Sequence, residues 1–201
     1  IATFFGLVPS ENAILGNSIY SNSSGSTPGL GIDILADTDN DFVPDTDLLV
    51  NPNDAGDGDV GPNHKLNYPI VSNVASSGDD VSITYSLDVD NAEGPATGYR
   101  VEFFANVSAN PSGHGDGQLY LGYENISGSV SNHTFTISNT GLPIGTYAFA
   151  LTATQIDASA PFGFRSTSEY SGVEVAGITQ TASVITNPTT VPTTTTAPTG
   201  I

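Results

Sequence analysis

Residues 81–89 read VSITYSLDV and residues 99–107 read YRVEFFANV, and these two stretches decide the fold class. In the first, an apolar side chain stands at every second position, with Ser, Thr or Asp between. In the second, Tyr, Val, Phe and Ala alternate with Arg, Glu, Phe and Asn. A period of two residues is typical of a half-buried antiparallel strand. Each stretch therefore predicts a β-strand with one face in a core.

The same alternation continues along the chain, with Gly, Pro, Asn, Asp and Ser between the runs. About seven such runs over residues 68–176 predict an immunoglobulin-like antiparallel β-sandwich. No stretch has the period of an amphipathic helix, so the fold class is all-β. We expect four aromatic side chains on the apolar faces to lie in the core. They are Tyr99, Phe103, Tyr147 and Phe149. The further runs are QLYLGY at 118–123, HTFTIS at 133–138, TYAFALTAT at 146–154 and SGVEVAG at 171–177.

Residues 1–32 predict a different kind of β-structure. Residues 1–10, IATFFGLVPS, predict one apolar strand that ends at Pro9. Residues 11–32 repeat short β segments separated by Asn and Gly, which is typical of a coil of a parallel β-helix. About three coils are needed to bury a shared core. We therefore expect either that preceding coils were removed, or that this segment packs on something else.

Residues 33–67 begin with an acidic segment, defined here as residues 33–59. It carries nine of the 21 acidic residues of the chain and no Lys or Arg. Oxygen ligands at alternate positions of a loop suit a hard cation such as Ca²⁺, whereas Mg²⁺ retains more of its water. The run from Asp37 to Asp45 follows the spacing of an EF-hand loop, with the Val43 carbonyl at position seven. The alternative is a solvated acidic linker.

Two positions depart from the EF-hand pattern. Phe42 stands where Gly is usual, and Leu48 stands where a bidentate Glu is usual. Asp47 or a carboxylate from the end of the segment would have to complete the coordination. The predicted Ca²⁺ ligands are Asp37, Asp39, Asp41, Val43, Asp45, Asp47, Asp54, Asp57 and Asp59.

The overall charge limits the classes of partner that the chain can bind. The formal net charge is −18, and the only basic residues are Lys65, Arg100 and Arg165. Nucleic acids and anionic membranes are bound by clustered Lys and Arg, so both are excluded as partners. There is no cysteine, which excludes disulfides and thiol chemistry. No apolar run approaches the ~20 residues of a membrane span.

The C-terminal residues 177–201 are rich in Thr and Pro. Such a tail is typical of a flexible linker. Because Thr and Val favour extended structure, the alternative is a strand donated to a sheet edge, in this chain or in a neighbouring copy.

Four Asn-x-Ser/Thr sequons indicate an exported glycoprotein. They place predicted glycosylation at Asn22, Asn106, Asn125 and Asn132. The alternative is chance, because a chain rich in Ser, Thr and Asn produces sequons freely.

Catalysis is not predicted. The loop 111–117 holds Ser112, His114 and Asp116, but the members of a catalytic triad normally come from separate elements. We expect a hairpin loop there, and no ligand role for His133 in its strand. The chain has no Trp, so a sugar-stacking platform would rely on Tyr and Phe.

The order of these blocks resembles a known surface-protein arrangement. ENAILGNSIYSN (11–22), GLGIDI (29–34) and NPNDAGDGDVGPNHKLNYPIV (51–71) resemble the end of the right-handed parallel β-helix of secreted CSLREA-type repeat proteins. YRVEFFANVSANPSGHGDGQLYLG (99–122) and GTYAFALTATQID (145–157) are similar to the β-sandwich appended to those helices. The resemblance implies an exported surface or matrix protein and no defined catalytic activity.

Together these observations predict four regions: an N-terminal strand and β-helix-like coil (1–32), an acidic cation-binding region (33–67), a sandwich (68–176) and a tail (177–201). The predicted function is a non-catalytic, calcium-stabilised structural subunit, extracellular or on the cell surface, that assembles with itself into a filament or surface layer through its terminal strands. The alternatives are an adhesion or carbohydrate-binding module of a larger β-helix protein, and a fragment of a β-helix enzyme.

Overall fold

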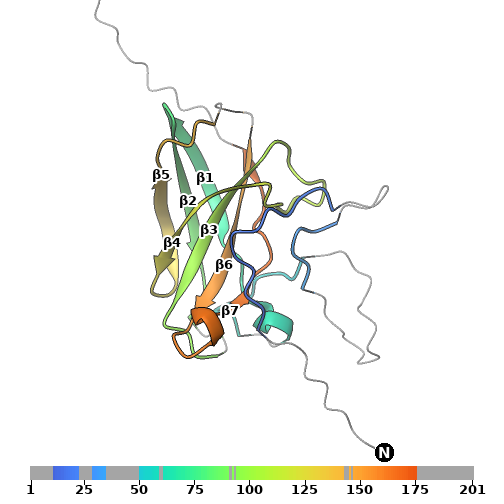
Figure 1. Ribbon diagram of the computed structural model, residues 1–201, viewed down its shortest axis with the longest axis vertical. Helices are drawn as coiled ribbons and strands as arrows, with labels where there is room; N and C mark the ends of the chain where they lie inside the picture. The colour runs from blue at the N-terminus through green and yellow to red at the C-terminus, as the bar shows by residue number, and fades with distance from the viewer. Residues whose placement is uncertain are drawn as a thin grey trace, which may run out of the picture.

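The computed structural model describes residues 11–22, 29–34, 50–58, 61–90, 92, 94–142, 145 and 147–175, and these residues form an all-β sandwich (Figure 1). Its elements in chain order are η1 (Pro62–Lys65), β1 (Ile70–Ser77), β2 (Asp80–Leu87), β3 (Gly98–Asn106), β4 (Leu119–Ile126), β5 (Val130–Ile137), β6 (Ala148–Ile156), η2 (Pro161–Gly163), β7 (Phe164–Thr167) and β8 (Glu174–Val175).

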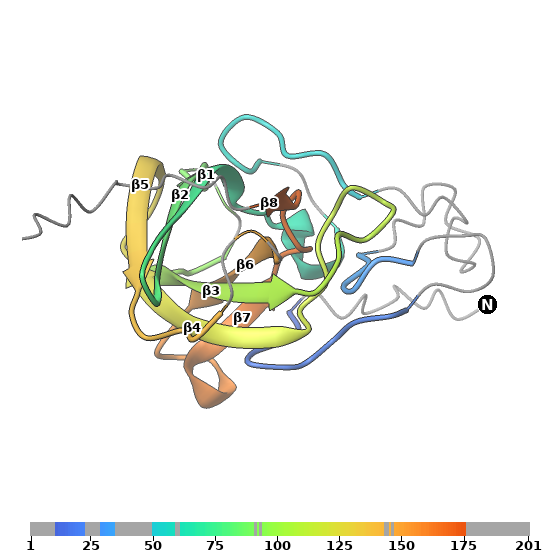
Figure 2. The ribbon, with the colours of Figure 1, turned by 90° about the horizontal axis from the view of Figure 1, so that it is seen from above.

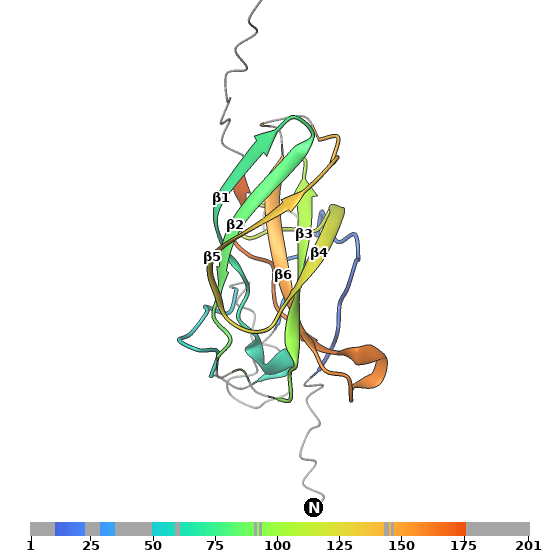
Figure 3. The same ribbon diagram turned by 90° about the vertical axis from the view of Figure 1, so that its left-hand side faces the viewer.

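Two antiparallel sheets make the two layers. The first sheet has the order β1-β2-β5, and the second has the order β4-β3-β6-β7, with β8 also paired to β6. The layers face each other in Figure 2, and Figure 3 shows the strands of both sheets running along the molecule. Strands that are consecutive in sequence cross between the layers, as β2 to β3 and β5 to β6 do. Each sheet therefore combines strands from separate parts of the chain, and the chain passes between the two layers as it forms them.

The main core lies between the two layers. The predicted aromatic residues confirm it, because Tyr99, Phe103 and Phe149 are buried and Tyr147 packs against the same cluster. The other buried members are Leu66, Val71, Val74, Val81, Ile83, Tyr85, Leu87, Val89, Val101, Ala105, Leu151 and Ala153.

The expectation that each strand has one core-facing side and one solvent-facing side is confirmed for β2. It is wrong for β3 and β6, in which nearly all residues are buried. In β2, buried and half-buried side chains alternate from Asp80 to Leu87. In β3, by contrast, Glu102 and Phe104 on the outer face are 1% and 2% exposed. The reason is that another part of the chain covers the outer face of the second sheet.

That cover is formed by residues 11–22 and 29–34, called here the covering segment. It lies along the second sheet on the side away from the first sheet (Figure 2). A second hydrophobic cluster joins Ile32 and Ile34 to Phe104, Ala150 and Tyr170, with Ile14, Ile19 and Val173 packed against it. Of the two expectations for this segment, packing on something else is confirmed, because it packs on the second sheet of the same chain.

The β-pairing that the structure gives for the described part of residues 11–34 is an antiparallel bridge. It joins Ile19 to Gly117, with N–O distances of 2.9 and 2.7 Å. A parallel β-helix coil stays a prediction. Residues 1–10 and 177–201 lie outside the described residues, and so do the predicted terminal strands.

Buried polar groups also hold the covering segment in place. Glu102 accepts a hydrogen bond from the backbone nitrogen of Gly16 at 2.8 Å, and Thr167 Oγ1 accepts one from Ile14 at 2.8 Å. Burial raises the pKa of the Glu102 carboxyl. The outer layer is therefore attached by directional bonds as well as by apolar contact.

Candidate functional site at the base of the acidic segment

The predicted calcium ligands fall on both sides of the boundary of the described residues. Asp54 and Asp57 belong to the described stretch 50–58. The other predicted ligands lie outside it: Asp37, Asp39, Asp41, Val43, Asp45, Asp47 and Asp59.

Asp54 and Asp57 bind backbone groups of their own region. Asp57 is 1% exposed, and its Oδ1 accepts a hydrogen bond from the nitrogen of Asn67 at 2.7 Å. The Asp54 carboxylate accepts one from Gly58 at 3.1 Å. Carboxylates of this kind shape a tight loop by replacing backbone partners.

Amide side chains fasten this loop to the sandwich. Asn67 Oδ1 accepts from the nitrogen of Asp54 at 3.1 Å, and its Nδ2 donates to the carbonyls of Asp54 at 2.9 Å and Asp88 at 2.8 Å. Asn53 pairs with the backbone of Tyr68 in both directions, at 2.7 and 3.0 Å. Sequence reasoning missed both asparagines, because a fastening residue of this type has no periodic signal.

Glu169 ties together Ile34 and Asn51, the residues that flank positions 35–50 of the acidic segment. Its Oε1 accepts a hydrogen bond from the nitrogen of Ile34 at 2.8 Å, and its Oε2 accepts one from the nitrogen of Asn51 at 2.8 Å. Asn51 Nδ2 closes the arrangement by donating to the carbonyl of Ile34 at 2.6 Å. We call these three residues the Glu169 clasp. It brings residues 34 and 51 to one point on the sandwich.

The clasp holds a perturbed carboxyl. Glu169 is 1% exposed, and burial raises its pKa from the usual 4.5 to about 7. The nearby Asp33 raises the pKa further, and the hydrogen bonds from Ile34 and Asn51 oppose the rise. Burial and then the Glu169 charge raise the pKa of the Tyr68 hydroxyl as well. The base of the acidic segment is therefore a region where further negative charge is unfavourable.

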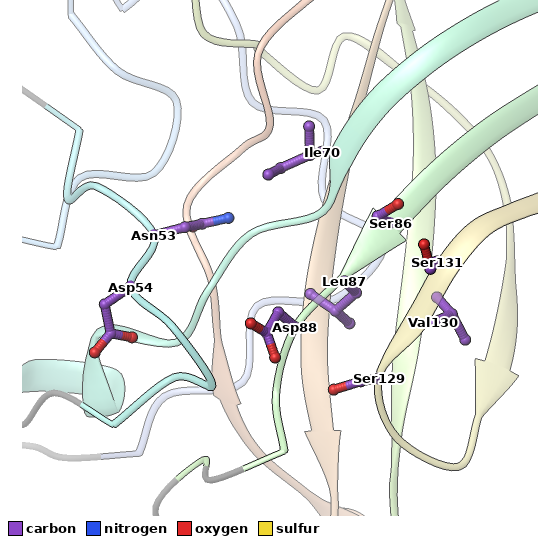
Figure 4. Close-up of a pocket in the computed structure, with 9 residues that line it drawn as sticks. All are labelled: Asn53, Asp54, Ile70, Ser86, Leu87, Asp88, Ser129, Val130 and Ser131. Atoms are coloured by element: carbon purple, nitrogen blue, oxygen red, sulfur yellow. The ribbon is translucent and has the colours of Figure 1, made fainter.

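A cavity of about 470 Å³ lies between this loop and the end of the first sheet (Figure 4). Polar side chains come from the loop, from the end of β2 and from the turn before β5, and apolar side chains lie between them. The lining residues are Asn53, Asp54, Ile70, Ser86, Leu87, Asp88, Ser129, Val130 and Ser131. Asp88 accepts a hydrogen bond from Gly56 at 2.9 Å, and Ser129 accepts one from Val89 at 2.8 Å. The lining thus combines two carboxylates and three hydroxyls with the apolar side chains of Ile70, Leu87 and Val130.

Among the described residues, no group of three His, Cys, Asp or Glu side chains is placed to hold a metal ion. Asp54 and Asp57 alone do not make such a group, and a complete Ca²⁺ shell would draw on residues outside the described stretches. The calcium site stays a prediction.

In loop 111–117 the side chains of Ser112, His114 and Asp116 form hydrogen bonds with groups other than one another's side chains, unlike the members of a catalytic triad. Ser112 Oγ bonds the backbone of His114, His114 Nδ1 lies 3.1 Å from the carbonyl of Tyr170, and Asp116 accepts from Asn110 at 3.1 Å. The loop packs over β6, where a Cβ on Gly115 would lie 2.0 Å from the Cβ of Ala150. Gly115 and Gly117 serve close packing, because a Cβ on Gly117 would likewise lie 2.1 Å from the Tyr170 hydroxyl.

The four sequons differ in their environment. Asn106 is 2% exposed and its Nδ2 donates to the carbonyl of Asp116 at 2.7 Å, so a glycan there would have to displace this bond. Asn22, Asn125 and Asn132 have exposed side chains.

No family model and no curated protein matches the chain. Among solved structures it is similar to one titled "Titin kinase and its flanking domains", at 18% identity and a TM-score of 0.29. The match covers 55% of this chain and 17% of that chain. A similarity of this extent carries no argument about function. In the part of the chain that the structure describes, no helix has the length and apolar character needed to cross a membrane.

Proposed function

We propose that this chain is a non-catalytic extracellular structural subunit, an immunoglobulin-like module whose acidic segment binds Ca²⁺. The single observation that carries the proposal is the Glu169 clasp, in which one buried carboxylate accepts hydrogen bonds from the nitrogens of both Ile34 and Asn51. The sequence between them holds five aspartates and no basic residue. A clasp that joins the ends of so acidic a stretch opposes charge repulsion, and a bound cation would relieve it.

The clasp also favours a structural role over a mobile linker. It attaches Ile34 and Asn51 to the same sandwich whose second sheet the covering segment covers, and a module fixed at these points would behave as one stiff unit. Stiff units joined end to end make filaments or layers, and terminal strands that pair with a neighbour's sheet edge would supply the joints. Residues 1–10 and 177–201 are the proposed joints.

Calcium binding is tested by calorimetry and thermal unfolding of the whole chain, with Mg²⁺ as the comparison ion. At a Ca²⁺ concentration of 100 times Kd, binding to the folded chain adds about 2.7 kcal/mol to the free energy of unfolding. The double variant Asp39→Asn/Asp41→Asn should lose this gain. The variant Asp79→Asn/Asp90→Asn removes the same charge from exposed positions on the sandwich and should keep it. Equal behaviour of the two variants would contradict the calcium site.

Assembly is tested separately by light scattering and electron microscopy, before and after chelation. Filaments or layers that dissociate on chelation support the proposal. Deletion of residues 1–10 or of residues 180–201 should abolish assembly while the sandwich stays folded. Unchanged assembly in both deletions would overturn the proposed joints.

The cavity in Figure 4 favours a second candidate, a carbohydrate-binding adhesion module. Hydroxyl and carboxylate groups beside Ile70, Leu87 and Val130 suit a ligand that has both polar edges and apolar faces. A panel of neutral oligosaccharides is titrated against the chain. Ser131→Phe, which fills the cavity, should abolish binding, whereas Ser138→Phe, at an exposed site outside it, should not.

A further inference from the structure

The exposed half of the second sheet's outer face carries a stack of flat side chains. The Arg100 guanidinium carbon lies 3.9 Å from the ring centroid of Tyr123 and 4.5 Å from that of Phe164. We call Tyr123, Arg100 and Phe164 the Arg100 shelf. The shelf is open to solvent, since Tyr123 is 47% exposed.

The position of Arg100 is unusual for so acidic a chain. It is one of three basic residues beside 21 acidic ones, and its guanidinium lies over two aromatic rings. A guanidinium stacked between rings keeps its N–H donors directed outward in its plane. The shelf therefore offers apolar ring faces and hydrogen-bond donors together.

Asn125 stands beside this shelf. It lies opposite Arg100 in the β3–β4 register, and its Oδ1 is 3.5 Å from Arg100 Nε. Because residues two apart on a strand share a face, Tyr123 and Asn125 both project from the outer face. Asn125 is exposed, and it begins the sequon Asn125-Ile126-Ser127.

No other sequon has this arrangement in the described part of the chain. Asn22 also follows a tyrosine by two residues, but Ser21 between them has φ 59°, so the strand geometry is absent. Asn132 has φ 48° and follows Val130 by two residues. Asn106 is buried.

We propose that Asn125 carries an N-linked glycan whose first sugar packs on the Arg100 shelf. The proposal rests on the export of the chain, which is part of the proposed function. In the transfer, Asn125 Nδ2 bonds to the anomeric carbon of a lipid-phosphate-linked oligosaccharide. The anomeric C–O bond to phosphate breaks, the amide gives up one proton, and the lipid phosphate leaves with it.

The physical basis is a preformed surface. A pyranose presents C–H groups on one face and hydroxyls at its edge, which match the Tyr123 ring and the Arg100 donors. The shelf is already stacked in the bare protein, so docking of the sugar orders few side chains. Because the sugar is attached to the same strand as the shelf, its local concentration is high, and it does not have to bind the shelf from free solution.

Occupancy is measured first, by mass spectrometry of the peptide that spans Asn125 in protein purified from its native host. A sugar on Asn125 is expected. An unmodified Asn125 in exported protein would overturn the proposal while leaving the structural subunit intact. Calcium insensitivity and lack of assembly, in turn, would leave the glycan proposal standing if Asn125 is occupied.

Packing on the shelf is measured next, by a thermodynamic cycle on the glycosylated protein. Ser127→Ala removes the sequon and keeps Asn125, and it should lower the thermal midpoint by about 2–4 °C. In a Tyr123→Ala background the same change should have no effect. Tyr20→Ala is the matched control, since Tyr20 is 48% exposed and also stands two residues before a sequon. It should leave the effect of Ser127→Ala unchanged. An effect of Ser127→Ala that survives in Tyr123→Ala would overturn the shelf.

Discussion

The Glu169 carboxylate accepts a hydrogen bond from the backbone nitrogen of Ile34 at 2.8 Å, across 135 residues of sequence. The second oxygen binds Asn51, so one buried side chain fixes both ends of an acidic stretch. A carboxylate so placed also makes stability depend on pH.

The first prediction concerns that dependence. Because the pKa of Glu169 rises from 4.5 to about 7 on folding, the folded chain takes up a proton between these values. The free energy of unfolding contributed by this group is therefore greatest below pH 4.5 and falls as pH rises through 7, by up to about 3 kcal/mol.

Denaturant unfolding of Glu169→Gln at pH 5, 6, 7 and 8 measures this contribution. The variant should show a flatter decline than the wild type, and Asp79→Asn, at an exposed position, should keep the wild-type slope. Parallel slopes for wild type and Glu169→Gln would show that another group titrates.

The second prediction concerns the close approach of loop 111–117 to β6. A Cβ on Gly115 would lie 2.0 Å from that of Ala150, and the Gly115 nitrogen is held on the carbonyl of Ser171 at 2.8 Å. Gly115→Ala should lower the free energy of unfolding by about 1–3 kcal/mol through overpacking. Gly128→Ala has no atom within 4 Å of the new Cβ and should be close to neutral. Equal unfolding midpoints for the two variants would contradict this packing.

The third prediction concerns two serine hydroxyls that accept hydrogen bonds from backbone nitrogens of β6, in the place of carbonyls of a neighbouring strand. Leu151 N donates to Ser171 Oγ at 3.0 Å, and Ala153 N donates to Ser168 Oγ at 3.0 Å. Ser171→Ala would leave the buried Leu151 N–H without its acceptor, and the loss should be about 1–3 kcal/mol. Thermal unfolding should show the loss, and Ser131→Ala, at an exposed position, should not.

The fourth prediction concerns the side of the sandwich where β4 and β5 are the outer strands. The buried Tyr85 hydroxyl donates to Glu124 at 2.8 Å, and His133 Nε2 lies 3.0 Å from the other oxygen of that carboxylate. Burial and Glu124 raise the pKa of Tyr85, which keeps the donor protonated. Tyr85→Phe should cost about 1.5–3 kcal/mol, because a hydrogen bond to a charged group is lost. Tyr20→Phe, at an exposed position, should be neutral in the same unfolding assay.

Sequence periodicity was sufficient for the strands. The runs around Val81, Tyr99 and Phe149 predicted β2, β3 and β6, and their inward residues are the core. The run at 171–177 was less informative, since only Glu174–Val175 is a strand among its described residues. In that run Ser171 accepts a hydrogen bond from β6 through its side chain, and a two-residue hydrophobic period does not indicate such a contact.

What the sequence by itself determined is the local alternation, and hence which strands exist and which of their faces meets the core. Only the tertiary structure decided what lies on the other face. Glu102 and Phe104 read as a solvent face, but residues 11–34 cover them from more than 60 positions away. Glu169 likewise carried no signal, because its meaning comes from Ile34 and Asn51. Periodicity shows which side chains of one strand share a face. The burial of those side chains and the pKa of a carboxyl depend on segments that loop closure brings from elsewhere in the chain.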